Sequence, residues 1–459
     1  MFIKLIAFEF KKLMTGIPVK AAIILNCIIL IVFAVENADQ LDTAYARAAV
    51  SFFNTYAFYG EEYEAVAFYR LVIEFVHSME AESVDLGLLP SYRLFLDYME
   101  GRLKYLVSMI QSTALLYEQL NANDIDSAFI EFHNFISMRY QFGLFTDDAR
   151  FDLIRARNGV WPMRTSRYEQ LYNFSTYLLE NDIRPLSDND MTPFNFLYQV
   201  FYRLLPLYFF FIIAVVCFRN IAGDIENNSL TFNIVQPITR FKLLFSKYIT
   251  AVLASLLAVL APLLAVAMVL GFINGFDSPR YPVLVHEQAY LSFTPLYNEL
   301  GTSERLIGGI SGNASAFSIS DRLGISRFNI LSNRVVDFTP DERLGFVPIY
   351  RFLILTLPLL IGLAAMFTGW VFFLGLLFKR RLLSFLVSLG AAAAGVFYAA
   401  PMENLGLAER LNPFLSLQAG RILNGLGSTT ALTALLVSLA FAILLFCSGY
   451  VLFKKLELR

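Results

Sequence analysis

Long apolar runs separated by polar stretches divide this chain into blocks. A membrane-spanning helix needs about 20 mainly apolar residues. Six runs meet that length, and they cover residues 17–35, 196–218, 248–272, 348–378, 382–400 and 431–453. The chain is 57% hydrophobic and only 16% charged, which is too few charges for an ordinary soluble domain. We therefore expect an all-α polytopic membrane protein with six transmembrane helices.

The positions of Lys and Arg predict the orientation of these helices. If the N-terminus is cytoplasmic, the inner flanks of the spans hold fourteen basic residues and four acidic ones. Residues 36–195, on the opposite side, hold 24 acidic and 12 basic residues. Cytoplasmic segments near spans are typically enriched in Lys and Arg. Both termini are thus predicted to be cytoplasmic.

The first sixteen residues form a separate predicted element. On a helical wheel one side is polar and the other apolar, the polar side being Lys4, Glu9, Lys11 and Lys12 and the apolar side Phe2, Ile6, Phe10 and Leu13. This pattern predicts an amphipathic interfacial helix over residues 1–16, with its lysines facing anionic headgroups. The alternative is a basic flank that simply begins the first span, but Gly16-Ile17-Pro18 favours a break between two helices.

Three segments are predicted to lie outside the cell. Residues 36–195 have apolar positions at spacings of three and four and little Gly or Pro, so we expect a large, mainly helical extracellular domain. Residues 273–346 are rich in Gly, Ser and Asn and predict loops with short strands or helices. Residues 401–428 form an extracellular or re-entrant segment.

Motifs for catalysis are missing from the sequence. There is no GxxxxGK[ST] phosphate loop and no HExxH pattern, and the GISG at 309–312 lies in an external loop. The six spans contain no acidic residue and no histidine, which argues against an ion-coupled transporter. We expect no enzyme activity, metal or cofactor in this chain, and an energy source in a partner.

The polar stretch IENNSLTFNIVQPITR, Ile225 to Arg240, lies in the predicted cytoplasmic loop 219–247. An acidic residue, a small polar pair, an apolar run, a proline and basic residues follow one another before the third span. This order resembles the cytoplasmic loop of ABC type-2 exporter permeases, although Asn228 stands where that family usually has glycine. The resemblance implies a docking helix for an ATPase, formed by Glu226, Asn228, Ser229, Leu230, Phe232, Ile234, Val235, Pro237 and Arg240, with Lys247 opening the next span.

LNPFLSLQAGRILNG, at 411–425, extends the resemblance, because the family has an Asn-Pro segment that dips into the membrane before its last span. Asn412 and Pro413 are thus candidates for contact with substrate or a gate. So are Arg203 and Arg351, charges at the predicted outer ends of spans, although both could simply anchor the helix at the interface.

The resemblance implies a permease subunit of a bacterial plasma-membrane ABC exporter. Two copies of a cytoplasmic ATPase subunit would bind ATP and Mg, and a second permease copy or a homologous permease would complete the membrane body. Membrane lipid is expected as a partner and nucleic acid is not. The cargo would be of peptide, antibiotic, lipid or polysaccharide type. The alternative is an ABC-driven signalling or mechanotransmission module, which acts on a cell-envelope partner without transport.

Overall fold

The computed structural model describes residues 2–57, 90–122, 124–146, 165–186, 190–218, 220–227, 239–293, 344–398, 411–424 and 429–455, with a few positions between 66 and 78. It is mostly helical, as predicted. The chain divides into two units. The first comprises Met1–Ala38, Asp190–Thr302 and Arg343–Arg459, and the second comprises Asp39–Asn189 and Ser303–Glu342.

Among the described residues of the first unit, five helical segments are long and apolar enough to cross a membrane. These segments are Ile17–Ala38, Tyr208–Glu226, Arg240–Asn274, Ile349–Phe378 and Ala431–Lys454. They belong to α2 (Ile17–Ala57), α9 and α10 (Leu205–Cys217 and Ile221–Glu226), α12 (Arg240–Asn274), α16 (Ile349–Phe378) and α20 (Ala431–Lys454). The prediction of a multi-pass helical membrane protein is confirmed for these five.

The predicted fifth span, 382–400, forms a shorter helix, α17 (Arg381–Tyr398), whose apolar described part is Arg381–Gly395. At a rise of about 1.5 Å per residue, this part is shorter than the roughly 30 Å hydrocarbon core of a membrane, so six crossings stay a prediction. The predicted orientation of the termini also stays a prediction, because the structure contains no membrane.

The predicted second span, 196–218, is interrupted rather than continuous. It begins as α8 (Pro193–Gln199), passes through a π-helix at Val200–Leu204 and continues as α9. Pro206 has no N–H to donate to the carbonyl one turn earlier, and the N–H of Leu205 instead reaches the Val200 carbonyl. The proline explains why the regular helix restarts here.

A similar defect in α12 is satisfied by another helix. Pro262 lies inside α12 and leaves the Ala258 carbonyl without its helical donor. The side-chain amide of Asn26, fully buried on α2, donates to the carbonyls of Ala258 and Val259 at 3.0 and 3.1 Å. A polar residue in the first span therefore pairs with a backbone group that a proline has released in the third.

The far end of α12 is attached to the start of α8. Asn274 donates to the Met191 carbonyl at 2.9 Å. Just beyond, Asp277 accepts hydrogen bonds from the backbone N–H groups of Phe194 and Asn195, both at 3.0 Å, and from the hydroxyl of Thr192 at 2.9 Å. Asp277 thus caps the N-terminus of α8 from another segment, where Thr192 makes no capping bond of its own.

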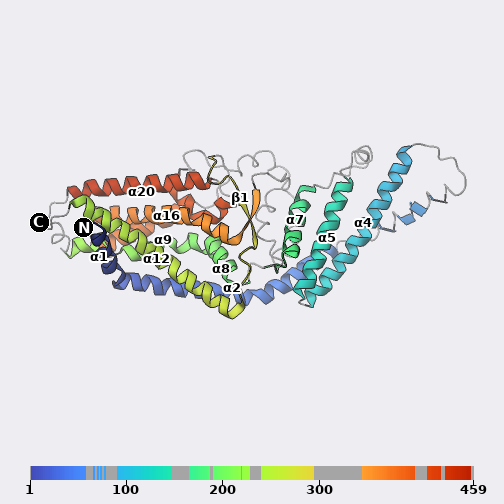
Figure 1. Cartoon of the computed structure of the whole chain (residues 1–459), viewed down its shortest axis with the longest axis horizontal. Helices are drawn as coiled ribbons and strands as arrows, with labels where there is room; N and C mark the ends of the chain where they lie inside the picture. The colour runs from blue at the N-terminus through green and yellow to red at the C-terminus, as the bar shows by residue number, and fades with distance from the viewer. Residues whose placement is uncertain are drawn as a thin grey trace. The chain divides into compact units, whose positions relative to one another are not determined.

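Helices α16 and α20 pack closely along their length, and Figure 1 shows them side by side next to α9 and α12. A methyl group at Gly362 would lie 3.1 Å from Leu435, and one at Gly369 would lie 3.4 Å from Leu445. Small residues at this interface let the two backbones approach each other. Apolar side chains from α2, α9, α12, α16, α17 and α20 form one continuous core.

Two short elements depart from an all-α fold. Strands β1 (Pro282–His286) and β2 (Leu344–Pro348) pair antiparallel, with Leu284 opposite Phe346. They lie at the two ends of the predicted region 273–346, where short strands or helices are expected, and β2 leads directly into α16. A 3-10 helix, Pro413–Gln418, and α19 (Ala419–Leu423) precede α20.

The second unit includes the helices α4 (Pro90–Asn121), α5 (Ile125–Thr146) and α7 (Thr165–Glu180), and α5 packs against both α4 and α7. The His133 ring stacks on Tyr172, with centroids 5.4 Å apart, and its Nδ1 lies 2.8 Å from the Ser175 hydroxyl. The prediction of a mainly helical region in 36–195 is confirmed for these segments, whereas its extracellular location stays a prediction.

Candidate functional site

Helix α1 (Phe2–Met14) lies along the first turns of α12. Phe2 stacks on Phe245, with ring centroids 6.1 Å apart, and Phe10, Leu13 and Met14 pack on the main core. The predicted apolar side of the helix therefore contacts protein. Of the predicted polar side, Lys4 and Lys11 are exposed, whereas Glu9, which shares that side of the helical wheel, is buried.

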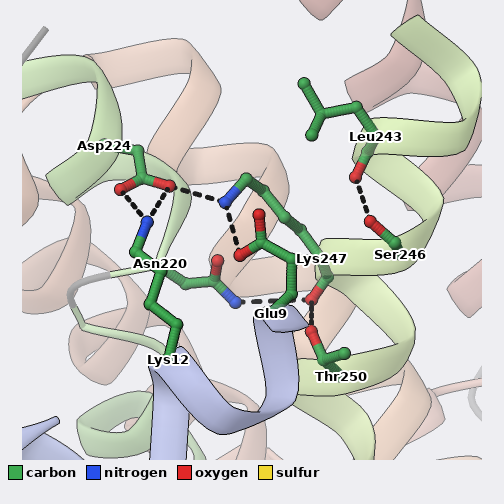
Figure 2. Close-up of polar contacts among 8 residues, drawn as sticks. All are labelled: Glu9, Lys12, Asn220, Asp224, Leu243, Ser246, Lys247 and Thr250. Carbon is green, nitrogen blue, oxygen red and sulfur yellow. Dashed lines mark hydrogen bonds and ion pairs between the residues drawn. The ribbon is translucent and has the colours of Figure 1, made fainter. Parts of the chain in front are cut away.

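Four charged side chains from α1, α10 and α12 lie together, and we call them the charge cluster: Glu9, Lys12, Asp224 and Lys247 (Figure 2). Lys247 of α12 is 1% exposed, and its ammonium donates to Glu9 Oε2 at 2.9 Å and to Asp224 Oδ2 at 2.6 Å. Lys12 donates to both Asp224 oxygens, at 3.0 and 3.3 Å. The cluster joins α1, α10 and α12.

Backbone contacts support the position of Lys247. Its carbonyl accepts from the Thr250 hydroxyl at 3.0 Å and from the side-chain amide of Asn220 at 3.4 Å (Figure 2). Asn220 precedes α10, so the segment that carries Asp224 is attached to α12 through backbone as well as side chain. Nearby, the Ser246 hydroxyl donates to the Leu243 carbonyl at 2.9 Å.

The charge cluster is stable in a buried position only when all of its charged partners are present. Two positive and two negative charges balance, and each buried group has an opposite partner within hydrogen-bonding distance. Burying an ion is costly in a low-dielectric interior, and removing one partner leaves the other unpaired at a cost of about 3–5 kcal/mol. The cluster therefore links the three helices strongly in this one arrangement.

A cavity of about 320 Å³ opens beside the charge cluster. Its lining includes all four charged residues, together with the polar residues Asn220, Asn227 and Thr250 and with Leu13, Gly16, Pro18, Val19 and Val216. The cavity extends from the cluster to Asn227, the last described residue before the predicted docking loop.

The two described ends of that loop are attached to other helices. Glu226, at the end of α10, accepts from Arg381 of α17 at 2.9 Å. Arg240, at the start of α12, donates to the backbone carbonyl of Lys454 at the end of α20, at 2.8 Å. Of the predicted docking residues, these two therefore have defined partners in the membrane unit.

The other predicted docking residues lie outside the described part of the chain, and they are Asn228, Ser229, Leu230, Phe232, Ile234, Val235 and Pro237. Of the range 219–247, residues 221–226 and 240–247 are helical, because α10 and α12 extend into it. Thr239 caps α12, its hydroxyl accepting from the Lys242 N–H at 3.4 Å.

The four predicted gate or substrate residues belong to three different elements. Arg203 is within the π-helix, and Arg351 is exposed in the first turn of α16. The Asn412 side chain accepts from the Phe414 N–H at 3.0 Å and Pro413 begins the 3-10 helix, so both have structural roles in starting that helix.

Sequence reasoning counted Lys247 and Asp224 as flanking charges and did not pair them. A signal was present, because Lys247 lies in LLFSKYITAV with apolar residues on both sides. An isolated charge in such a run is usually paired. Within the described residues, no group of three His, Cys, Asp or Glu side chains could hold a metal ion.

Comparisons with protein-family models, with curated proteins and with solved structures found no match to this chain.

Proposed function

We propose that this chain is the membrane subunit of an ATP-driven exporter of the ABC type-2 kind, energised by separate cytoplasmic ATPase subunits. The observation that carries the proposal is the charge cluster. The loop 228–238 connects α10 to α12, and Asp224 and Lys247 join these same two helices by a buried ion pair. A force applied to the loop would reach both spans and α1 together.

The loop sequence supports the docking part of the proposal. LTFNIV places four large apolar residues in six positions, followed by Pro237. An apolar segment of this kind can insert into a groove on a partner protein. The ATPase subunits would bind ATP and Mg, and movement of their grooves would shift α10 and α12 and so change access to a route through the membrane unit.

Purification of the full chain from membranes of its native host tests this proposal. The protein should retain a Walker-motif ATPase, identified by mass spectrometry, together with ATP hydrolysis. A variant with Phe232→Asp and Ile234→Asp should lose both. The matched control is Thr231→Asp with Asn233→Asp, which adds the same charge at the interleaved polar positions and should retain both. Equal retention by the two variants would refute docking through this face.

A second candidate function, mechanical signalling to a cell-envelope partner, is favoured by one feature. Helix α2 continues to Ala57, well beyond its apolar segment Ile17–Ala38. A continuous helix can carry a movement of the span into the polar region that follows. Reconstitution with the ATPase in liposomes separates the two: transport predicts substrate accumulation coupled to hydrolysis, and signalling predicts hydrolysis without flux.

A further inference from the structure

An open apolar pocket of about 560 Å³ lies between the first turn of α2, the last turn of α9 and the first turn of α17. Six apolar side chains line it, and they are Ile17, Pro18, Val215, Phe218, Leu382 and Phe385. Leu382 is 61% exposed and Ile17 is 74% exposed. This wall is suited to hydrocarbon, because exposed apolar surface of this kind needs a nonpolar occupant.

Among the described residues of the lining, the charged side chain is that of Arg381. Its Nε donates to Glu226 at 2.9 Å, and the side chain is one-third exposed. A guanidinium has five N–H donors in a planar fork, so one carboxylate contact leaves donors for an anion. Arg380 and Lys379, both exposed, precede it directly in the chain. Three positive charges against one carboxylate give this end of α17 a net positive charge.

The backbone at the start of α17 also favours binding of an anion. Residues 381–383 form the first turn of α17, where N–H groups lack helical acceptors and the helix dipole is positive. The side chain of Ser384, in the same turn, is 2% exposed, and its hydroxyl has no hydrogen-bond partner among the described residues. Ser384 lines a second, small cavity that shares Phe218, Arg381 and Phe385 with the pocket.

We propose that this pocket binds an anionic phospholipid, with an acyl chain against the apolar wall and the phosphate at Arg380, Arg381 and the start of α17. The apolar wall favours a lipid over a free phosphate, which would gain nothing from it. The excess positive charge favours an anionic headgroup over a zwitterionic one. The site is separate from the charge cluster and does not depend on the proposed exporter function.

Native mass spectrometry of the full chain in a neutral detergent tests the proposal. Dioleoyl phosphatidylglycerol, dioleoyl phosphatidylcholine and soluble glycerol phosphate are the three probes. Phosphatidylglycerol should bind about tenfold more tightly than phosphatidylcholine, because both lipids carry the same phosphodiester but only phosphatidylcholine adds a cationic choline, which the basic residues repel. Glycerol phosphate should not bind measurably. Equal binding of both lipids would overturn the charge argument, and equal binding of glycerol phosphate would replace the lipid with a free anion.

Two variants locate the site. Arg380→Gln changes an exposed side chain and should remove most of the preference for phosphatidylglycerol, whereas Lys11→Gln, an equally exposed change on α1, should leave it unchanged. Leu382→Trp should fill the pocket and weaken binding of phosphatidylglycerol, whereas Leu386→Trp, one turn further on the exposed face of α17, should not. If Arg380→Gln and Leu382→Trp both bind like the unmodified chain, the proposal is wrong. If Leu382→Trp instead dissociates a dimer, the pocket belongs to a contact between copies.

Discussion

The ammonium of Lys247 lies 2.6 Å from the carboxylate of Asp224, across the loop that is predicted to dock an ATPase. The Lys247 side chain is 1% exposed and also donates to Glu9. Replacing Lys247 with Met keeps much of its volume but leaves two carboxylates buried without their shared partner. We expect the free energy of unfolding to fall by about 3–5 kcal/mol, measured by thermal or denaturant unfolding in detergent.

The control for this change is Lys242→Met on the same helix, where the lysine is exposed and the expected effect is below about 0.5 kcal/mol. Asp224→Asn combined with Lys247→Met should cost less than the sum of the two single changes, because the double variant removes opposite charges together. Similar losses at 242 and 247 would show that the buried pair does not stabilise the fold.

We expect Asn26 to contribute to the free energy of unfolding because Pro262 leaves the Ala258 carbonyl without its helical donor. Asn26→Leu removes the donor to the Ala258 and Val259 carbonyls, and an unsatisfied buried carbonyl costs about 1–3 kcal/mol. Pro262→Ala restores a backbone N–H that can bond to Ala258. In that background, Asn26→Leu should cost clearly less, and a double-mutant cycle of unfolding free energies measures the difference. Strict additivity would mean that the proline and the amide are not linked.

Acidification should destabilise the second unit through His133. Burial lowers the pKa of His133 below its usual value. The unfolded chain therefore binds a proton at a higher pH than the folded one, so stability is complete above the ordinary histidine pKa of about 6.5 and falls as the pH drops below it. Thermal unfolding at pH 7.5 and pH 5.5, for the full chain and for His133→Gln, should show a smaller pH effect in the variant.

The neighbouring exposed residue gives the control for this pH effect, since Asn134→Gln should leave the pH dependence unchanged. The Ser175 hydroxyl donates to the Tyr172 carbonyl at 3.1 Å, so its single hydrogen is used there and His133 Nδ1 is the donor in the contact between them. Ser175→Ala should therefore leave an unsatisfied buried Nδ1–H and destabilise the unit at neutral pH. An identical pH response in the unmodified chain, His133→Gln and Asn134→Gln would contradict the role of His133.

Two glycines on α17 should respond in opposite ways to the same change. A methyl group at Gly395 would collide with the ring of Phe414, which precedes α19, whereas one at Gly390 would meet nothing within 4 Å. We expect Gly395→Ala to destabilise by about 1–3 kcal/mol. Gly390→Ala should stabilise by up to about 1 kcal/mol through helix propensity. Unfolding in detergent measures both, and a stabilising Gly395→Ala would show that Phe414 does not pack there.

The helices of the membrane unit were largely predictable because long apolar runs have few alternative structures. The boundaries were less so. The run 196–218 gave no sign of the π-helix before Pro206, since periodicity within an almost wholly apolar stretch carries little information. The range 219–247 was treated as one loop because its ends are polar, yet both ends are helical and attached to other spans.

The candidate site was predictable only in part. Glu226 and Arg240 could be found from the order of residues in the loop, and their partners Arg381 and the Lys454 carbonyl could not, because these contacts join segments more than 150 residues apart. Glu9 was placed with the exposed lysines by its position on a helical wheel. Only the three-dimensional arrangement shows that this position faces Lys247.

The bonds at the two ends of α12 restrict how the membrane unit can move. At one end Lys247 joins Asp224, and at the other Asp277 and Asn274 join residues 191–195. Sliding of the third span along the second would have to break polar contacts at both ends at once, whereas rotation of the pair as one body breaks neither. A rearrangement that costs less energy than this sliding must therefore open contacts with other helices. The second and third spans are thus expected to move together as one rigid body.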